Sequence, residues 1–281
     1  MDEAAIAFWD ALAPAWTDEW PSPPLRPSRS DIETFEGWAR RAARGEGRGL
    51  DALLLGLTRA IASMAWPAGT RLAAVDGSAA MIRHVWPRVG APPGAVAIHA
   101  DWSGMPLDGA SRDFAAADCI HGVLPSRDEC DGVHAEARRV LRKGGWFCVR
   151  TFLRPAVPES VEALFEELRS GAVRSLHLFY WRLAAALQGE SPDGVLLHRA
   201  WEAWHRHMRD SAELEALAAA CGWLEQEIRL IGHWRDARIA RTAPSWTDLE
   251  GYARGRFEIV DRVRPTGGGG EHFVLVAMRA C

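Results

Sequence analysis

The sequence predicts an α/β protein built on a doubly wound, mostly parallel β-sheet with helices on both faces. Between residues 50 and 152, short apolar runs alternate with helical stretches, a pattern typical of strand–helix–strand units. The apolar runs are nearly continuous, so each strand is expected to be buried on both faces, as in a parallel sheet. Residues 157–222 show helical spacing throughout, which predicts a helical insertion after the fifth strand.

Five strands are expected in the first part of the sheet, over residues 52–55, 71–75, 95–98, 113–118 and 146–149. Helices are expected between them over 58–65, 78–85 and 127–141. Lys143-Gly144-Gly145 is expected to end the last of these helices, because glycine adopts the left-handed conformation that closes a helix. Crossovers this short are right-handed and place helices on both faces of the sheet.

The flanking segments suggest a division into four parts. Residues 1–50 form an N-terminal helical cap, with a proline run over 21–27 and a second helix from Ser30 to about Arg44. Residues 51–152 form the core of the sheet, 153–250 a mostly helical lid, and 251–281 the strands that complete the sheet. The lid contains predicted helices over 161–168, 173–187, 196–208 and 212–220, and later strands are expected over 223–231, 256–263 and 273–278, with a glycine-rich connector over 267–270.

Composition excludes several classes of function. A net charge of −4 gives no electrostatic argument for nucleic-acid binding. No apolar run approaches the ~20 residues of a membrane span, and the acidic N-terminus lacks a signal core, so a cytoplasmic protein is expected. The five isolated cysteines predict neither disulfides nor a zinc site. His205 and His207 are two apart on a predicted helix and cannot share a face, so no metal site is expected.

In a doubly wound sheet, ligands bind outside the carboxyl ends of the strands, near the point where the strand order reverses. The residues that follow the first four predicted strands are therefore the candidates for a binding site. They are Gly56 and Thr58 after the first strand, Asp76, Gly77 and Ser78 after the second, Asp101 and Trp102 after the third, and Asp118, Cys119 and His121 after the fourth. A single aspartate there is often only a helix cap or turn residue, but three along one edge predict a ligand site.

The types of these residues suit a nucleoside. Asp76 stands twenty residues after Gly56, which fits a carboxylate that accepts hydrogen bonds from both ribose hydroxyls. Asp101 is expected to accept from an exocyclic adenine amine. Trp102 and Met81 are expected to sandwich the purine by stacking and by sulfur contact, although a core position is a common alternative for Met81.

Three stretches resemble class I S-adenosylmethionine-dependent methyltransferases, a family with a Rossmann-like sheet. Residues 72–82, LAAVDGSAAMI, resemble the acidic motif at the second strand, and residues 100–107, ADWSGMPL, resemble the adenine-binding aspartate and its loop. Residues 136–145, EARRVLRKGG, resemble the E-x-x-R-V-L-x-x-G-G ending before the fifth strand. The resemblance implies S-adenosylmethionine as cofactor and S-adenosylhomocysteine as product. It also implies that Asp118 and Cys119 contact the cofactor and that the segment with Trp16, Trp20 and Arg26 folds over it.

The first loop departs from the family's G-x-G-x-G pattern. Gly56 matches its first glycine, but Thr58 and Ala60 stand where the other two occur. We expect the Thr58 hydroxyl to replace one backbone contact and Arg59 to approach the cofactor carboxylate. The sulfonium is already activated for methyl transfer, so a base is needed only for an acceptor that loses a proton. His121, after the fourth strand, is the predicted base, with a purely structural histidine as the alternative.

Three functions remain open from the sequence. The first is a methyltransferase that acts on a small molecule whose identity the sequence leaves open. The second is a non-catalytic methyltransferase-like module that binds a nucleoside or a partner protein, since the first loop is altered. The third, a nicotinamide-dependent oxidoreductase, requires a G-x-G-x-x-G motif that residues 56–61 lack.

Overall fold

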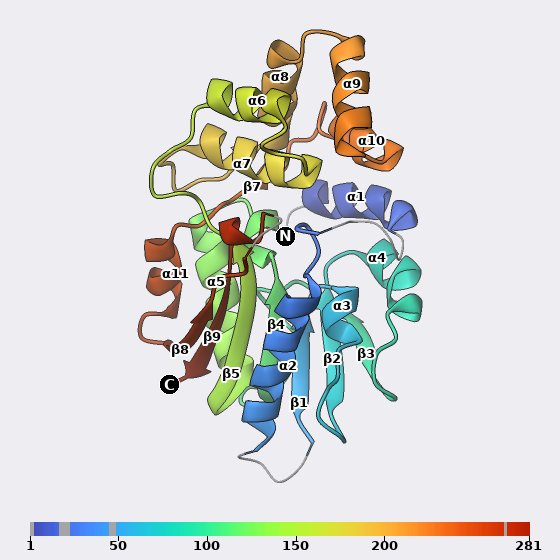
Figure 1. Ribbon diagram of the computed structural model, residues 1–281. Helices are drawn as coiled ribbons and strands as arrows, with labels where there is room; N and C mark the ends of the chain where they lie inside the picture. The colour runs from blue at the N-terminus through green and yellow to red at the C-terminus, as the bar shows by residue number, and fades with distance from the viewer. Residues whose placement is uncertain (1–2, 17–22, 45–48, 267–268) are drawn as a thin grey trace.

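A seven-stranded sheet forms the centre of the computed structural model, which describes residues 3–16, 23–44, 49–266 and 269–281. Its strand order is β3-β2-β1-β4-β5-β9-β8 (Figure 1). The strands are β1 (Asp51–Leu55), β2 (Arg71–Asp76), β3 (Val96–His99), β4 (Arg112–Asp118), β5 (Leu141–Phe152), β8 (Phe257–Val263) and β9 (Phe273–Ala280). Strands β1 to β5 are parallel, and β9 pairs antiparallel with β5 and β8. The predicted doubly wound, mostly parallel sheet is confirmed.

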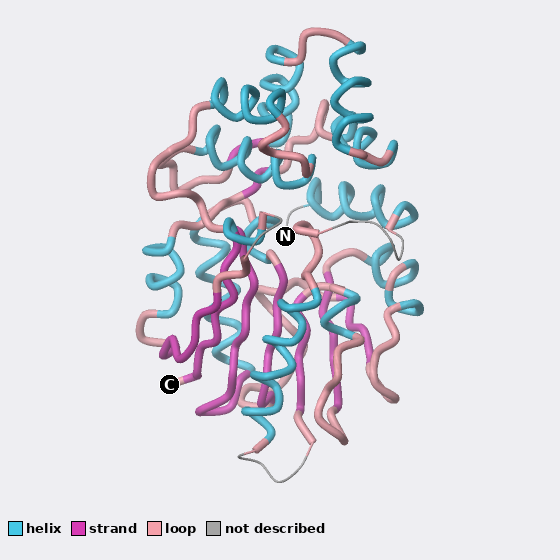
Figure 2. Tube along the Cα trace, in the orientation of Figure 1, coloured by secondary structure: helices cyan, strands magenta, loops and turns pink. Residues whose placement is uncertain are grey.

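Helices cover both faces of this sheet (Figure 2). On one face lie α2 (Arg29–Ala43) and α3 (Arg59–Ala62), and on the other lie α5 (Arg127–Val140) and α11 (Trp246–Ala253). Strand β1 divides its side chains between the two layers: Leu54 packs in the cluster that holds Phe35 and Trp38 of α2, and Leu53 packs in the cluster that holds Val133 of α5. All five of its residues are buried; the apolar run over 52–55 predicts this burial, whereas Asp51 is a buried carboxylate at the start of the strand.

A second layer of helices lies beyond the carboxyl ends of the parallel strands (Figure 1). It contains α1 (Glu3–Leu12), α6 (Val161–Ser170), α7 (Leu176–Gln188), α8 (Leu197–His207), α9 (Ser211–Cys221) and α10 (Glu225–His233). A short ribbon of β6 (Val195–Leu196) and β7 (Ala240–Arg241) joins it. Residues of α1, α6, α7 and α8 share one apolar cluster. The helix α4 (Ala79–His84) and the 3₁₀ turns η1 (Ala13–Ala15), η2 (Trp86–Arg88), η3 (Ile120–Val123) and η4 (Gly270–His272) complete the described elements.

The structure differs from the prediction in one element type and in several boundaries. Most of residues 223–231, predicted as a strand, lies in helix α10 (Glu225–His233), because the short apolar pattern also fits a helix that buries Leu230 and Ile231 on one side. Helix α2 begins at Arg29, and its capping box is Ser28 with Asp31. Helix α5 ends at Val140; Gly144, with φ +76°, instead lies in an irregularity where β5 shifts register against β4.

Candidate functional site at the carboxyl edge of the sheet

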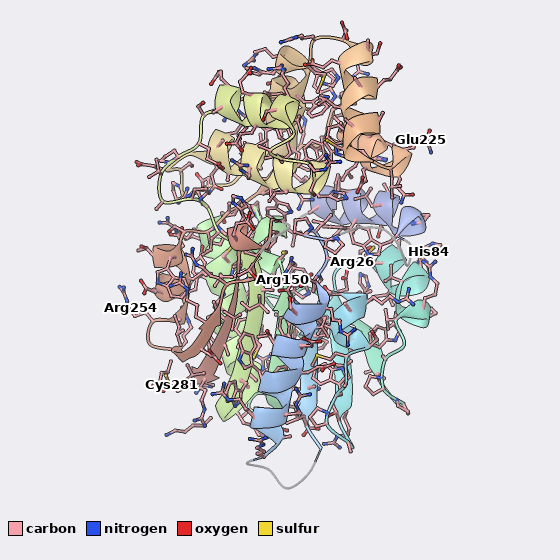
Figure 3. All side chains as sticks on the ribbon, in the orientation of Figure 1. Arg26, His84, Arg150, Glu225, Arg254 and Cys281 are labelled. Carbon is pink, nitrogen blue, oxygen red and sulfur yellow. The ribbon has the colours of Figure 1, made fainter. Side chains whose placement is uncertain are left out.

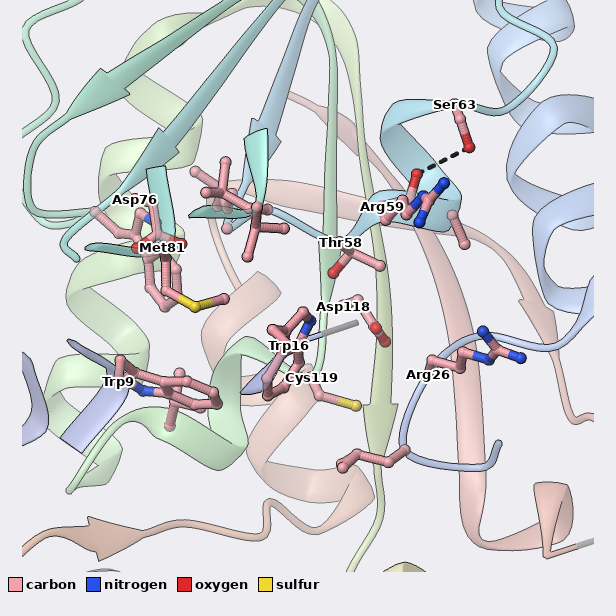
Figure 4. Close-up of a pocket in the computed structure, with 18 of the residues that line it drawn as sticks. Trp9, Trp16, Arg26, Thr58, Arg59, Ser63, Asp76, Met81, Asp118 and Cys119 are labelled. Carbon is pink, nitrogen blue, oxygen red and sulfur yellow. Dashed lines mark hydrogen bonds between the residues drawn. The ribbon is translucent and has the colours of Figure 1, made fainter. Parts of the chain in front are cut away.

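A cavity of about 330 Å³ lies at the carboxyl ends of the parallel strands (Figure 4). Strands β1 and β4 are neighbours here although two strands separate them in the sequence, so this is the point where the strand order reverses. Of the predicted binding residues, the cavity is lined by Gly56, Thr58, Asp76, Met81, Trp102, Asp118 and Cys119. Gly77, Ser78, Asp101 and His121 do not line it.

Asp76 ends strand β2 as a buried carboxylate facing this cavity. Its Oδ1 accepts a hydrogen bond of 2.8 Å from the backbone N–H of Ser78. Burial raises the pKa of Asp76 to about 6, because the charged form loses solvation and the Ser78 hydrogen bond only partly compensates. The carboxylate is therefore held in place and ionised at neutral pH, with acceptor capacity left for a ligand.

Asp101 lies at the same edge but outside the cavity lining. The N–H of Ala100 donates to the carbonyl of Asp76 at 3.1 Å, so the ends of β2 and β3 are adjacent. The Oδ1 of Asp101 accepts from the backbone N–H of Ser103 at 2.8 Å and from its hydroxyl at 2.7 Å. Asp76, Asp101 and Asp118 therefore lie along one edge of the sheet, as predicted. The described hydrogen bonds of Asp101, however, are made within its own loop.

Trp102 forms one wall of the cavity in a fixed orientation. Its Nε1 donates to the carbonyl of Val75 at 2.7 Å, and the same carbonyl accepts from the N–H of Gly56 at 2.8 Å. Gly56 has φ +84°, a conformation that favours glycine, and a Cβ there would lie 3.6 Å from the Trp102 ring. The first loop and Trp102 are thus both hydrogen-bonded to the carbonyl of Val75. Met81 lines the same cavity.

Figure 4 shows Asp76 and Met81 at one end of the cavity and Arg26 and Arg59 at the other. Thr58 stands between them on the first loop. It precedes α3, but its side chain makes no capping hydrogen bond to that helix. The hydroxyl of Thr58 is therefore free to bond a ligand in the cavity.

Ser78 is fully buried and caps α4. Its hydroxyl accepts from the N–H of Met81 at 3.0 Å and donates to Asp10 of α1. The hydroxyl of Ser78 is therefore used within the protein, and Ser78 does not line the cavity. The same contact attaches helix α1 to the second strand's loop, which brings Trp9 and Trp16 into the cavity wall.

Asp118 lines the cavity as one member of a buried ion-pair network. Its Oδ1 accepts from Arg150 Nη1 at 2.8 Å, and Arg150 Nε donates to Asp31 Oδ2 at 3.1 Å. Arg150 is 1% exposed at the centre of the molecule (Figure 3) and stacks on Phe273, with its guanidinium carbon 4.2 Å from the ring centroid. Burial raises the pKa of Asp118, and the Arg150 guanidinium opposes that shift. This network fixes the end of β4 against helix α2.

Cys119 follows Asp118 with φ +53° and lines the cavity. Burial raises the pKa of its thiol well above the ordinary value, so the neutral thiol is favoured. Cys119 therefore offers a small apolar contact surface beside the end of β4.

His121 does not line the cavity, so the structure gives its assignment as the base no support. Its side chain is fully buried, with Nε2 2.9 Å from His134 Nε2 and Nδ1 3.0 Å from the Thr151 hydroxyl. The ring also stacks on Tyr252 of α11 at 5.7 Å. This burial and these ring contacts favour the alternative, a structural histidine.

The buried histidine pair is expected to make the protein less stable as pH falls. Burial lowers the pKa of His121 from 6.5 to about 3, and burial also lowers that of His134. The unfolded chain therefore binds more protons than the folded one between these values. The free energy of unfolding is therefore highest above pH 6.5. At pH 5, protonation of His121 in the unfolded chain is expected to lower it by about 2 kcal/mol.

This dependence is measurable by urea denaturation at pH 7 and pH 5, for the wild type and for His121→Asn. The variant is expected to lose less free energy of unfolding between the two pH values, because asparagine does not titrate. Equal losses in both proteins would show that His121 does not carry this effect.

Several residues of the site were not predicted. Leu25, Arg88, Trp181 and Arg241 line the cavity; the predicted Trp16 and Arg26 line it too, whereas Trp20 lies outside the described residues. Trp181 lies directly over η3, where a Cβ on Gly122 would meet its ring at 1.8 Å. Among the described residues, no cluster of three or more metal-binding side chains occurs, and no helix is long and apolar enough to cross a membrane.

Residues 53–149 match the family described as "Methyltransferase domain", whereas no curated protein matches the chain. Solved structures with the same fold include a Rhodobacter sphaeroides protein described as "Putative Zn-dependent Alcohol Dehydrogenases" (TM-score 0.67, 12% identity, all of both chains). They also include the N-methyltransferase NodS from Bradyrhizobium japonicum WM9 with S-adenosyl-L-homocysteine (0.52, 12%, 99% of both). A third is the methyltransferase CcbJ from Streptomyces caelestis (0.53, 14%, 98% of both).

At these identities the solved structures establish the fold alone. The zinc and the activity named in the first description are therefore properties of that protein alone. The matched segment runs from β1 to β5 and therefore contains Gly56, Asp76 and Trp102. Residues 53–149 thus match a methyltransferase domain, the fold is that of class I methyltransferases, and the resemblance found in the sequence is confirmed.

Proposed function

We propose that this class I methyltransferase-domain protein is an enzyme that transfers a methyl group from S-adenosylmethionine to a small molecule. The observation that carries the proposal is Asp76, a buried, ionisable carboxylate on a cavity at the reversal point of the sheet. The NodS structure, which holds S-adenosyl-L-homocysteine on the same fold, supports the choice of cofactor. When bound, the cofactor supplies an activated methyl group on a sulfonium.

The residues of the cavity divide into two ends that match the two halves of this cofactor. Asp76 would accept from the ribose hydroxyls, and Trp102 and Met81 would flank the purine. At the other end Thr58 would bond, and Arg59 and Arg26 would attract, the amino-acid portion. Asp118 and Cys119 would also contact the cofactor. Gly77, Ser78 and Asp101 would stabilise the loops that follow β2 and β3.

The remaining contribution of the protein is positioning. With His121 enclosed, the described residues place no histidine on the cavity wall. Methyl transfer depends on alignment of the acceptor with the methyl group, which bound geometry supplies. We propose that residues 153–250 act as the lid, because Trp181 and Arg241 of this insertion line the same cavity as Asp76.

Calorimetric titration with S-adenosylmethionine and S-adenosylhomocysteine tests the proposal. We expect both to bind with a dissociation constant below about 100 μM. Dissociation constants above about 1 mM for both would contradict the enzyme and favour a non-catalytic module, which the Thr58 and Ala60 substitutions in the first loop keep open. Methyl transfer to a bound acceptor, detected by mass spectrometry, then separates the enzyme from a module that only binds the cofactor.

A further inference from the structure

A second, smaller cavity of about 60 Å³ adjoins the first. The two share five lining residues, Trp9, Trp16, Leu25, Trp181 and Arg241, and the smaller one continues between helices α1, α7 and α10. It does not contain Asp76, Gly56 or Trp102. This space is therefore an extension of the site on the side away from the nucleoside end.

The walls of the smaller cavity are aromatic and carry unused hydrogen-bond donors. Tyr180 and Trp234 line it with ring centroids 4.2 Å apart. Within the described chain, neither the Tyr180 hydroxyl nor the Trp234 Nε1 has a hydrogen-bond partner, although both atoms are buried. Buried donors without partners are costly, so an acceptor group on a ligand would be favoured here.

Arg241 lies at the border of the two cavities and has no carboxylate partner among the described residues. Its Nη1 donates to the carbonyl of Gly122 at 2.9 Å, and its guanidinium carbon lies 5.8 Å from the rings of Trp9 and Trp181. No ion pair joins it to a carboxylate in the part of the chain that the structure describes. A desolvated guanidinium without an anion is unfavourable, and its planar fork matches a carboxylate.

Burial lowers the pKa of Arg241 to about 10, so the guanidinium is still a cation at neutral pH. Among the described residues, the Cys119 sulfur is the one group that would raise the pKa of Arg241, and Cys119 is itself favoured as a neutral thiol. Arg26 and Arg59 line the larger cavity but not the smaller one. They are thus placed for the cofactor's carboxylate, which leaves Arg241 for a different anion.

We propose that the methyl acceptor is a small aromatic carboxylate, held by Arg241 through its anionic group and enclosed by Trp9, Trp16 and Trp181. Because Arg241 borders the cofactor's cavity, a carboxylate oxygen is the atom placed to receive the methyl group: a C–O bond would form as the S–CH3 bond of the sulfonium breaks, giving a methyl ester and S-adenosylhomocysteine. The carboxylate is already anionic, so this transfer releases no proton and needs no base. The Tyr180 hydroxyl and the Trp234 N–H would bond a polar substituent at the far end of the ring. This inference rests on the proposed function, because it assigns the larger cavity to the cofactor.

The proposal is tested by ligand-observed NMR with benzoate, its neutral counterpart benzamide, and the non-aromatic cyclohexanecarboxylate, each with saturating S-adenosylhomocysteine. We expect benzoate to bind at least about 10-fold more tightly than benzamide, because a charged group bonds the guanidinium more strongly. It should also bind more tightly than cyclohexanecarboxylate. No detectable benzoate binding at about 10 mM, or equal binding of benzoate and benzamide, would overturn the assignment.

Variants at Arg241 locate the effect. Arg241→Gln is expected to weaken benzoate binding by about 10-fold or more while the affinity for S-adenosylhomocysteine changes less than about 3-fold. Arg241→Lys, which keeps the charge without the fork, is expected to be intermediate. Arg238→Gln, an exposed residue of the same segment, is the matched control and should change neither affinity.

The possible failures are distinguishable. If Arg241→Gln weakens S-adenosylhomocysteine as much as benzoate, Arg241 holds the cofactor and the acceptor assignment is wrong. If the wild type binds S-adenosylhomocysteine but no benzoate, only the acceptor class is wrong. If it binds benzoate but not S-adenosylhomocysteine, the proposed function is wrong. Circular dichroism and the thermal midpoint of each variant establish that it is folded.

Discussion

Replacing Asp76 by alanine is expected to weaken the binding of S-adenosylhomocysteine by about 100-fold or more. The carboxylate is the only acidic side chain that lines the nucleoside end of the cavity in the described structure, and two ribose hydroxyls would lose their charged acceptor. Calorimetry on the variant and the wild type measures the change. Because Asp76 is itself a buried carboxylate, its removal is not expected to unfold the protein.

Two comparisons make this result specific. Asp236→Ala changes an exposed aspartate and is expected to leave the affinity unchanged. In the wild type, affinity should also fall as pH drops below 6, because protonated Asp76 no longer accepts both bonds, and it should level off above that value. Unchanged affinity in a folded Asp76→Ala protein would remove the ribose assignment.

Replacing Arg150 by methionine is expected to lower the free energy of unfolding by about 3–5 kcal/mol. Arg150 is 1% exposed and neutralises Asp31 and Asp118, which are also buried. Without the guanidinium both carboxylates keep their desolvation cost and lose their partner, and Phe273 loses the cation stacked on it. Urea denaturation of the two proteins measures the difference.

The cause of that loss is tested by a compensating variant. In the Arg150→Met background, Asp31→Asn with Asp118→Asn removes the stranded charges and is expected to restore part of the stability. Arg29→Met is the surface control: its pair with Glu33 is largely exposed, so its removal is expected to cost less than about 1 kcal/mol. An equal loss at both arginines would contradict the role given to the buried network.

The sheet could be predicted because each strand is recognisable from a short stretch of the sequence. The buried strands are uninterrupted apolar runs, and a doubly wound topology then places the residues after each strand at one edge. That reasoning located Gly56, Asp76, Trp102 and Asp118 on the cavity. It did not separate residues that face the cavity from neighbours such as Ser78, whose hydroxyl binds Asp10, 68 positions away.

The rest of the site depends on contacts that no local pattern contains. His121 is enclosed because His134 and Tyr252, from two other helices, pack on its ring. Arg241 reaches the cavity from a two-residue strand and bonds Gly122, 119 positions earlier in the chain. Neither environment leaves a spacing or motif in the sequence, so the sequence predicted neither the burial of His121 nor the position of Arg241 on the cavity wall.

The wall between the two cavities has a consequence for the order of events. Trp9, Trp16 and Trp181 line both cavities. A ligand that fixes the orientation of these rings in one cavity therefore also fixes the wall of the other cavity. Occupancy of one compartment should then raise the affinity of the other, and thermodynamic reciprocity requires the same factor in both directions. A ternary complex would thus form cooperatively, and release of one product would lower the affinity for the other.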